Sequence, residues 1–244
     1  RAACLSNKAG GVDVHDLAYN TERITDPEVR KALSQAVNVP ELVQSLYRGY
    51  ASQATSILPS FMPGYSADVT QTEYNPEEAQ KVLADKGVTE LHMLAYTNPR
   101  PYNTATGQTL AEALQGYWSK VGITCTIDAY DWTTYKEKIG TGDYDVCLYG
   151  WIGDNGDPDN FLNLLDSEDI EINLAQYHNE EYSQMLAAAA SLPNGDERNA
   201  AYGEMEQKIA DENVWLPISH QENLAAYVSN VQNFIYHPTG NTYL

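Results

Sequence analysis

The residues best placed to do chemistry lie in the loop Gly150–Phe161, which joins carboxylates, amides and glycines to an apolar run, Tyr144 to Trp151. An apolar strand that opens into a polar loop at its C-terminal end is a frequent ligand position in open α/β sheets. The Asp154 carboxylate could meet a cation, and the Trp151 ring offers a flat apolar wall. Glycine at position 153 lets the backbone come close to a bound molecule. We therefore expect a ligand against the first half of this loop.

Two local alternatives apply to the same loop. Its oxygens could bind calcium, although it lacks an EF-hand register with glycine at the sixth position and contains Pro158. A helix start would place Asp157 at the N-cap, Pro158 at the first helical position and Asp159 near the positive helix end. That helix start accounts for residues 157–159 and leaves Trp151 to Asn155 as the ligand-binding candidates.

Composition narrows the function classes. The 244 residues suffice for one large or two modest domains, and 43% hydrophobic residues can fill a core. Thirty-four acidic against fourteen basic residues give a net charge of -20, which disfavours nucleic acid and anionic lipid as partners. No apolar run approaches the length of a membrane span. Because the sequence starts at Arg1 without a signal peptide, we expect a processed or trimmed chain.

The three cysteines, Cys4, Cys125 and Cys147, match no zinc or redox spacing. Cys125 and Cys147 lie in apolar runs, so we expect buried thiols there. An odd count leaves at least one thiol free if a pair forms. The cysteines therefore do not decide the redox compartment.

Apolar periodicity and turn residues predict strands that alternate with helices, which indicates an α/β sheet covered by helices. A polar cap followed by proline starts two of the helices, at Asp26-Pro27 and Asn75-Pro76. The expected strands cover 14–20, 90–96, 123–129, 144–151, 215–220 and 224–228. The expected helices begin at Pro27 and Pro40 and cover 76–87, 106–121, 132–139, 182–190 and 196–211, with 49–68 as a loop.

Four motifs resemble the peptide/nickel branch of bacterial ABC-transporter solute-binding proteins, the family 5 extracellular proteins, and its dipeptide-binding members in particular. The Gly-Trp-Ile-Gly-Asp-Asn-Gly-Asp-Pro-Asp-Asn-Phe run of residues 150–161 is the most specific of them. The resemblance holds in order and spacing from about residue 14 to the C-terminus. The other motifs are Arg100-Pro101-Tyr102-Asn103, Leu17–Glu22 followed by Asp26–Leu33, and Trp215–His220.

The resemblance implies a type II periplasmic-binding-protein-like lobe, an α/β unit with a mixed sheet flanked by helices. Family members have two lobes that close on a ligand, and residues 1–220 correspond to the C-terminal lobe. Residues 221–244 correspond to the segment that returns to the first lobe, which this sequence does not contain. We expect that segment to be mobile, and a single lobe to bind ligand weakly at best.

By the same resemblance, the Asp after Trp-x-Gly binds a peptide α-amino group, and the Arg of Arg-Pro-Tyr-Asn binds the α-carboxylate. Arginine suits this task because its planar fork pairs with a carboxylate in a bidentate manner. No cofactor or metal site is implied. The implied ligand-binding residues are Arg100, Asp154, Trp151, Ile152 and Gly153, with Tyr102 and Asn155 as further candidates.

The implied function is peptide capture for an ABC importer, with the permease subunits as partners. The implied location is the periplasm or the outer face of the membrane, as a lipid-anchored protein. Within the family, longer peptides, glutathione, haem or nickel are alternative ligands, and a peptide sensor is an alternative role. A glycosidase with paired carboxylates is the enzymatic alternative, but no catalytic motif supports it.

Overall fold

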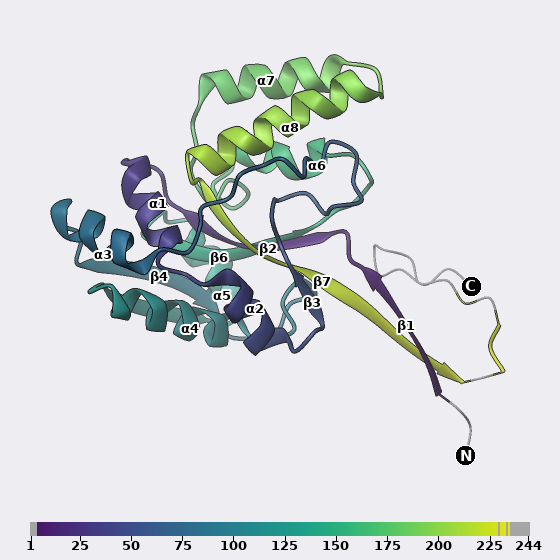
Figure 1. Cartoon of the computed structure of the whole chain (residues 1–244), viewed down its shortest axis with the longest axis horizontal. Coiled ribbons are helices and arrows are strands. Elements are labelled where there is room, and N and C mark those ends of the chain that lie inside the picture. Colours follow the sequence, from purple (N-terminus) through teal and green to yellow (C-terminus); the bar gives the residue numbers. More distant parts are fainter. Residues whose placement is uncertain (1–3, 229, 233, 235–244) are drawn as a thin grey trace.

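The computed structural model describes residues 4–228, 230–232 and 234. Within them, seven strands form a mixed sheet in the order β1-β7-β2-β6-β4-β5, and β3 pairs with β7 outside this path (Figure 1). The predicted α/β class is confirmed. The strands are β1 (Cys4–Gly10), β2 (Asp13–Tyr19), β3 (Ala51–Gln53), β4 (Glu90–Tyr96), β5 (Thr124–Tyr130), β6 (Val146–Ile152) and β7 (Trp215–Val228).

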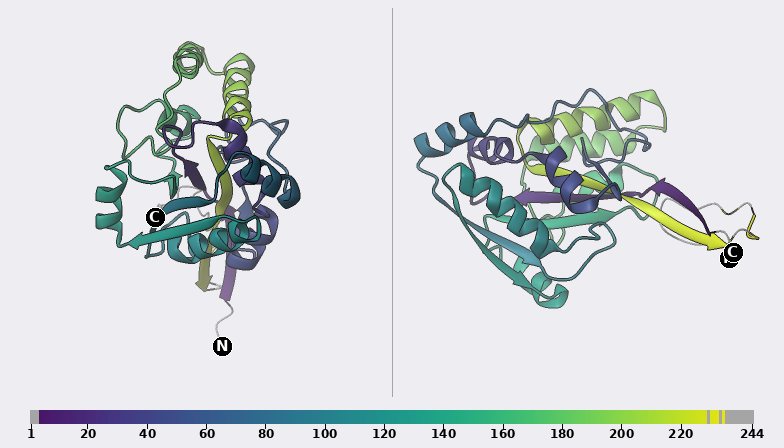
Figure 2. Two further views of the ribbon diagram at one scale, coloured as in Figure 1. Left: turned by 90° about the vertical axis from the view of Figure 1, so that its left-hand side faces the viewer. Right: turned by 60° about the horizontal axis from the view of Figure 1, so that its bottom comes forward.

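Helices flank the sheet, and α7 and α8 pack side by side in a pair of their own (Figures 1 and 2). Short polar side chains accept hydrogen bonds from the first-turn N–H groups of most helices, as at Asp26, Asn75 and Asp131. The helices are α1 (Pro27–Gln35), α2 (Val39–Tyr47), α3 (Pro76–Asp85), α4 (Gly107–Lys120), α5 (Trp132–Ile139), α6 (Asp159–Leu162), α7 (Glu180–Ser191) and α8 (Asp196–Asp211), with a 3-10 turn at Asn163–Leu165.

Three parallel strands position the candidate site. Strand β4 lies between β5 and β6 and is parallel to both, with Leu94 opposite Asp128 and Cys147. Helix α4 connects β4 to β5, and α5 connects β5 back to β6 on the other side of β4. Parallel crossovers follow a right-handed rule, so these two, which run in opposite directions along the sheet, are expected to place α4 and α5 on opposite faces. The carboxyl ends of the three strands therefore meet at one edge.

Strands β1 and β2 follow each other along the same antiparallel partner, β7. The register runs from Cys4 opposite Val228 to Gly10 opposite Glu222, and resumes at His15 opposite Ser219. The extra residues between them form a bulge. The outer part of this ladder, which we call the ribbon (residues 4–10 and 222–228), projects from the body of the molecule (Figure 1).

The bulge between β1 and β2 is closed by a side chain. The Gln221 N–H donates to Asp13 Oδ1 at 2.7 Å, and the Gly11 N–H donates to the Gln221 carbonyl at 2.8 Å. Burial, the largest effect, raises the pKa of Asp13 to about 7 despite the hydrogen bond from Gln221. Asp13 thus replaces a backbone acceptor where the ribbon leaves the body.

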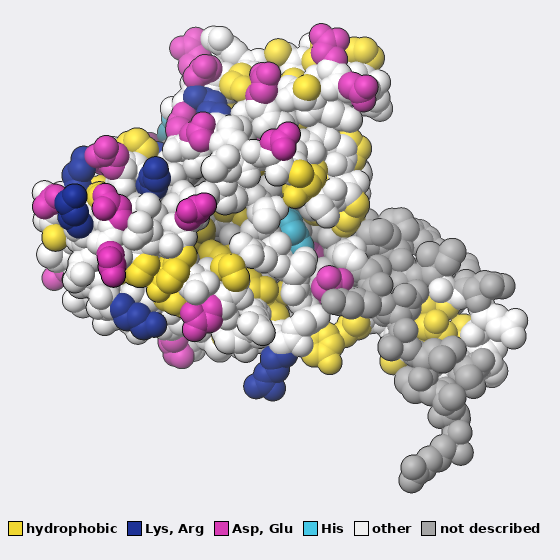
Figure 3. All heavy atoms as spheres, viewed as in Figure 1, with side chains coloured by type: hydrophobic (Ala, Val, Ile, Leu, Met, Phe, Trp, Pro, Cys, Tyr) yellow, Lys and Arg dark blue, Asp and Glu magenta, His cyan; other side chains and the backbone are white. Residues whose placement is uncertain are grey.

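Most of the predicted helices and strands are confirmed, and the residues that they bury are mainly apolar. The stripe of α4, namely Leu110, Leu114 and Tyr117, is buried together with Val121, and Cys125 and Cys147 are buried free thiols. The apolar residues Leu46 of α2 and Val82 of α3 are only partly buried. Acidic side chains are spread over the helices instead of forming one patch on the face drawn in Figure 3.

Several expected boundaries are wrong. The strands predicted at 215–220 and 224–228 are one strand, β7, because β1 and β3 pair with its polar middle section. The predicted loop 49–68 contains β3, and β1 was not expected. The assigned start of α6 lies one residue later than expected, with Pro158 at the N-cap position. The expected capping bond of Asp157 is nevertheless present, because its Oδ1 accepts from the Asp159 N–H at 3.0 Å while also pairing with Arg198.

The division of the chain at residue 220 stays a prediction. Residues 222–228 belong to the ribbon, so β7 runs across that boundary without interruption. We expected residues 221–244 to be mobile. Twelve of these residues, 229, 233 and 235–244, lie outside the described residues.

Candidate ligand-binding site

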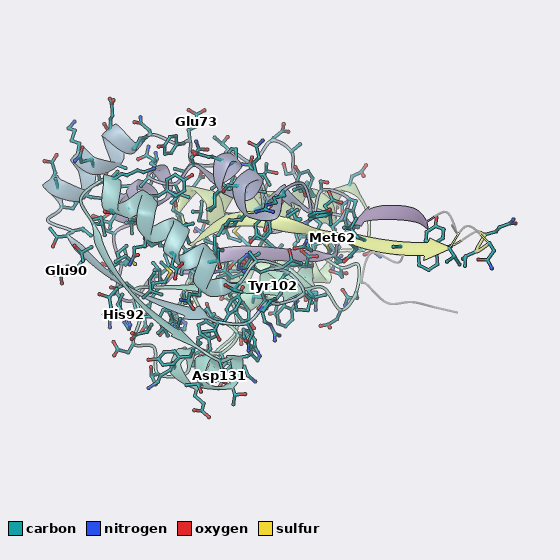
Figure 4. All side chains as sticks on the ribbon, turned by 90° about the horizontal axis from the view of Figure 1, so that it is seen from below. Met62, Glu73, Glu90, His92, Tyr102 and Asp131 are labelled. Atoms are coloured by element: carbon teal, nitrogen blue, oxygen red, sulfur yellow. The ribbon has the colours of Figure 1, made fainter. Side chains whose placement is uncertain are left out.

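Two loops leave the sheet at the same edge. Residues 97–103 follow β4 and residues 153–158 follow β6, its parallel neighbour. In Figure 4, Glu90 marks the start of β4, and Tyr102 lies beyond the opposite end of that strand. The fold therefore brings the loops that carry Arg100 and Asp154 to the same edge of the sheet.

Arg100 begins a tight turn that ends at Asn103. The Arg100 N–H donates to the Asn103 carbonyl at 2.9 Å, and the Asn103 N–H donates to the Arg100 carbonyl at 2.8 Å. The guanidinium carbon lies 3.8 Å from the ring centre of Trp132 and 5.9 Å from that of Tyr102. Both distances fall within the range of cation–π attraction.

The Arg100 charge lacks an anionic partner within the part of the chain that the structure describes. Its Nε is buried without a hydrogen-bond partner, and the side chain forms no ion pair there. A guanidinium held against aromatic rings in this way keeps its donors available for an anion from outside. Among the described residues, no carboxylate therefore competes for the Arg100 guanidinium.

The Tyr102 ring is seated on Gly150 of β6. A Cβ atom at position 150 would lie 2.4 Å from Tyr102 Cδ2 and 2.6 Å from the Val14 carbonyl oxygen, so only glycine fits there. The Tyr102 and His15 ring centres are 5.6 Å apart. Burial raises the pKa of the Tyr102 hydroxyl. This tyrosine therefore acts as a fixed wall beside Arg100.

Beneath the turn, four side chains form a closed ring of hydrogen bonds, which we call the His15 ring. The Tyr47 hydroxyl donates to Asn103 Oδ1 at 3.0 Å, and Asn103 Nδ2 donates to the Tyr96 hydroxyl at 3.1 Å. Tyr96 Oη and His15 Nε2 are 2.9 Å apart, and His15 Nδ1 and Tyr47 Oη are 3.3 Å apart. All four residues are buried.

The donors in the His15 ring can be assigned from its closure. The Tyr47 hydrogen goes to Asn103, so Tyr47 must accept from His15 Nδ1–H, and His15 Nε2 then accepts from the Tyr96 hydroxyl. Burial lowers the pKa of His15 to about 3, so the imidazole is neutral as this assignment requires. Every polar atom of the ring thereby finds a partner without a formal charge.

Sequence reasoning assigned no role to these residues. The signal that could have indicated them is the polar pair His15-Asp16 inside the apolar strand β2. Asp16 lies on the opposite face of β2 from His15 and pairs with Tyr149 of β6. It is fully buried, its Oδ1 has no hydrogen-bond partner, and burial raises its pKa to about 8.

Trp132 was also not expected at the site. It starts α5 and stacks on Tyr149, with ring centres 6.5 Å apart and an interplanar angle of 15°. Its other aromatic neighbours are Tyr96 and Tyr135. Trp132 thus links the Arg100 guanidinium to the aromatic residues of β4 and β6.

Asp154 lies at the start of the second loop and is exposed. Asn160 holds this part of the loop in place, because its Oδ1 accepts from Trp151 Nε1 and from the Asp154 N–H, both at 3.0 Å. Asn160 Nδ2 lies 3.4 Å from Asp154 Oδ2. Among the described residues no cation pairs with the Asp154 carboxylate.

The neighbours of Asp154 have distinct environments. The Ile152 side chain is partly exposed, whereas Gly153 is buried and its N–H donates to the Val12 carbonyl at 2.7 Å. A Cβ at position 153 would lie 2.7 Å from Val12 Cγ1. Glycine is therefore required here by close packing against Val12, and its N–H is already used within the fold.

A hollow of about 450 Å³ adjoins the same loop. Asn155 lies on its rim and accepts from the Asp157 N–H at 2.9 Å, while Asp157 pairs with Arg198 at 2.9 Å. The walls combine polar and apolar groups. They include Trp151, Asn155, Asp157, Asn160, Leu164 and Ile172.

Two further kinds of site were sought in the described part of the chain. No cluster of three or more His, Cys, Asp or Glu residues is arranged to hold a metal ion. No helix there combines the length and apolarity needed to cross a membrane.

Comparison with known proteins decides the family. Residues 6–172 match the bacterial extracellular solute-binding proteins, family 5 Middle. The chain belongs to this family. It is a family of solute-binding proteins and not of enzymes, and its members are extracellular or periplasmic.

Curated family 5 relatives match nearly all of the chain. Heme-binding protein A of Haemophilus influenzae is 29% identical over 242 residues, which are 94% of this chain and 43% of the relative. The dipeptide-binding protein of Escherichia coli K12 is 29% identical over 238 residues, or 94% of this chain and 44% of the relative. The chain thus spans less than half the length of these relatives.

Solved structures of the family share the fold. HbpA2 from Haemophilus parasuis matches with a TM-score of 0.91 and 26% identity, over 98% of this chain and 48% of that structure. The dipeptide binding protein from Pseudoalteromonas sp. SM9913 in complex with Met-Leu matches with a TM-score of 0.87 and 26% identity, over 98% and 49%. The expected solute-binding-protein fold is therefore confirmed.

Proposed function

We propose that this chain is the C-terminal lobe of the substrate-binding component of an ABC importer. The whole protein would capture di- or oligopeptides between two lobes and deliver them to the permease subunits. Residues 1–220 would form the lobe, and 221–244 would return to the first lobe. Relatives named as dipeptide-binding proteins, which extend well beyond the region matched here, support this proposal.

The observation that carries the proposal is a pair of opposite charges at one edge of the sheet, neither of which forms an ion pair with another described residue. Arg100 is held on Trp132, and Asp154 is held by Asn160. A free dipeptide carries a carboxylate at one end and an ammonium group at the other, so it complements both. We assign the peptide carboxylate to Arg100 and the amino group to Asp154. Closure around them would remove water and strengthen both interactions.

The remaining candidates have supporting parts. Trp151 and Ile152 would contribute apolar surface, and Tyr102 would limit the position of the ligand carboxylate. Gly153 would act by shaping the loop, because its N–H is taken by Val12. Asn155 would contact a ligand side chain that enters the adjoining hollow.

Calorimetric titration with Ala-Ala, its N-acetyl form and its C-terminal amide tests the two assignments in the two-lobed protein. We expect Arg100→Ala to weaken Ala-Ala binding more than about tenfold and to leave the amide unaffected, because the amide has no carboxylate to pair. Asp154→Asn should weaken Ala-Ala similarly and leave the N-acetyl form unaffected. The exposed residues Lys31 and Asp85 provide controls as Lys31→Ala and Asp85→Asn.

Unchanged affinity for Ala-Ala in both site variants would remove the charge-end mechanism. Equal affinity of the unmodified protein for free and capped peptides would do the same. A peptide that is bound and released intact separates binding from hydrolysis, and mass spectrometry of the ligand after incubation checks this.

Haem is a second candidate ligand because one matched relative is named a heme-binding protein. A Soret-band titration that saturates at one haem per protein, and that Arg100→Ala leaves unchanged, would favour it over a peptide. Glutathione, nickel and longer peptides enter the same titrations as competitors, and a peptide-sensing role would show as binding without uptake.

We place the protein outside the cytoplasmic membrane with a lipid anchor, which metabolic labelling with palmitate would detect.

A further inference from the structure

Asn103 is a buried residue that anchors the Arg100 turn to the body of the lobe, next to Tyr102, which packs on Gly150. The two backbone hydrogen bonds between Arg100 and Asn103 fix their relative position. Asn103 is completely buried, whereas Arg100 is only partly buried. The orientation of the exposed end of the turn therefore depends on what holds its buried end.

What holds Asn103 is the His15 ring. Its side-chain oxygen accepts from Tyr47 of α2, and its side-chain nitrogen donates to Tyr96 at the end of β4. His15 of β2 joins these two tyrosines on their far side. One asparagine thus ties the turn to a helix and two strands that are far apart in the sequence.

We propose that the His15 ring is the positioning device of the ligand-binding arginine: through Asn103 it sets the place at which Arg100 presents its guanidinium to a ligand carboxylate. The ring itself does not touch the ligand. The ligand part of this inference rests on the proposed function, whereas the positioning of Arg100 does not.

The aromatic neighbours make the position of the turn matter. Trp132 and Tyr102 restrict the position of the guanidinium. The Tyr102 side chain itself packs between Gly150 and the imidazole of His15. A turn released from Asn103 would shift Arg100 relative to Trp132. Bidentate pairing with a carboxylate requires a fixed orientation, so such a shift costs affinity for that group in particular.

The test uses Asn103→Ala and the milder Tyr47→Phe in the two-lobed protein. Tyr19→Phe is the matched control, because it removes one buried hydroxyl hydrogen bond, to Ser34, elsewhere in the fold. Affinities for Ala-Ala and for its C-terminal amide are measured by calorimetry. We expect both ring variants to lose Ala-Ala affinity, about tenfold for Asn103→Ala, with the amide changed less than about twofold.

A double variant separates positioning from general loosening of the site. On an Arg100→Ala background, Asn103→Ala should cause no further loss of Ala-Ala affinity beyond about twofold, because the arginine it positions is gone. Equal losses for Ala-Ala and its amide, or additive losses in the double variant, would overturn the proposal. So would unchanged Ala-Ala affinity in folded Asn103→Ala and Tyr47→Phe proteins.

A measurement without ligand keeps this inference separate from the proposed function. The Arg100 Nε–H resonance, identified as the one missing in Arg100→Ala, is followed by NMR. It should move toward the position of a solvent-exposed arginine in both ring variants and stay in place in Tyr19→Phe. An unmoved resonance in the ring variants would refute the positioning role. Failure of dipeptide binding with a moved resonance would count against the proposed function alone.

Discussion

Among the described residues of this acidic protein, three carboxyl groups are buried at separate places. Asp16 is enclosed between β2 and β6, Asp13 closes the bulge next to the ribbon, and Glu206 accepts from the Ser66 N–H at 2.9 Å. Burial is the largest effect on each, and it raises their pKa values to about 8, about 7 and about 8. Near neutral pH these groups hold protons that the unfolded chain releases.

This proton binding gives the free energy of unfolding a definite pH dependence. Between the ordinary carboxyl pKa and the raised values, the native state binds more protons than the unfolded state, so stability falls as pH rises. His15 opposes this trend only below pH 6.5, because its pKa is lowered to about 3. We therefore expect urea unfolding to show decreasing stability from pH 6.5 to 8, and Asp16→Asn to fall less steeply. A stability that rises over this interval, or equal slopes in both proteins, would contradict the assignment.

At the residue scale, sequence reasoning could predict Arg100 and Asp154 as candidates because each stands in a local motif after an apolar strand. It could not predict Trp132 or the His15 ring. Those contacts join residues that lie up to 81 positions apart in the chain, as between His15 and Tyr96. Such pairs are produced by strand order and helix packing, which no local pattern encodes.

At the scale of elements, β6 shows how the site is built into the sheet. The Tyr102 ring fills the space that a side chain at Gly150 would need, and Gly153, directly after the strand, packs against Val12. The strand that carries the Asp154 loop is therefore also the floor for the Arg100 turn. The two halves of the candidate site depend on one strand.

We expect Gly150→Ala to destabilise the protein by about 1–3 kcal/mol, because the new methyl group would overlap the Tyr102 ring and the Val14 carbonyl. Gly116→Ala in α4 is the matched control, since a Cβ there meets nothing within 4 Å, and it should stabilise the protein by about 0.5–1 kcal/mol. Denaturant unfolding measures both changes. Equal stability of the two variants would show that Tyr102 adapts without cost.

Helices were the most predictable elements, since Asp26, Asn75 and Asp131 mark their starts with side chains that accept from first-turn N–H groups. Strands β1 and β7 were harder. The sequence of β1 is not typical of a strand, and Gln221–Asn223 interrupts the apolar pattern of β7. Both become strands because they pair with each other, a contact that links the two ends of the described chain.

At the scale of the whole molecule, β7 connects the sheet to the ribbon, and the two parts of this strand have different numbers of neighbouring strands. Its first part lies in the sheet beside β2 and β3, whereas β1 is the described strand that pairs with its last part, 224–228. Leu224 and Val228 in that last part are exposed.

Hydrogen exchange measured by mass spectrometry on this 244-residue chain should reveal the difference between the two parts of β7. We expect slow exchange for the amides of 215–219 and faster exchange for those of 224–228, because opening the ribbon breaks fewer contacts. Uniform protection along β7 would mean that the ribbon opens only together with the sheet.

The ladder formed by β7 with β1 and β2 has a consequence for how binding specificity can be inherited. Because His15 lies opposite Ser219, the chain enters and leaves the body of the lobe through paired neighbours. Everything between them, including Arg100, Trp132 and Asp154, is a single insert with adjacent ends. We expect such an insert to be exchangeable between relatives as one unit, with the junctions in the ribbon, where backbone hydrogen bonds hold the two strands together. Recognition of the two charged ends of a ligand would then travel with this insert.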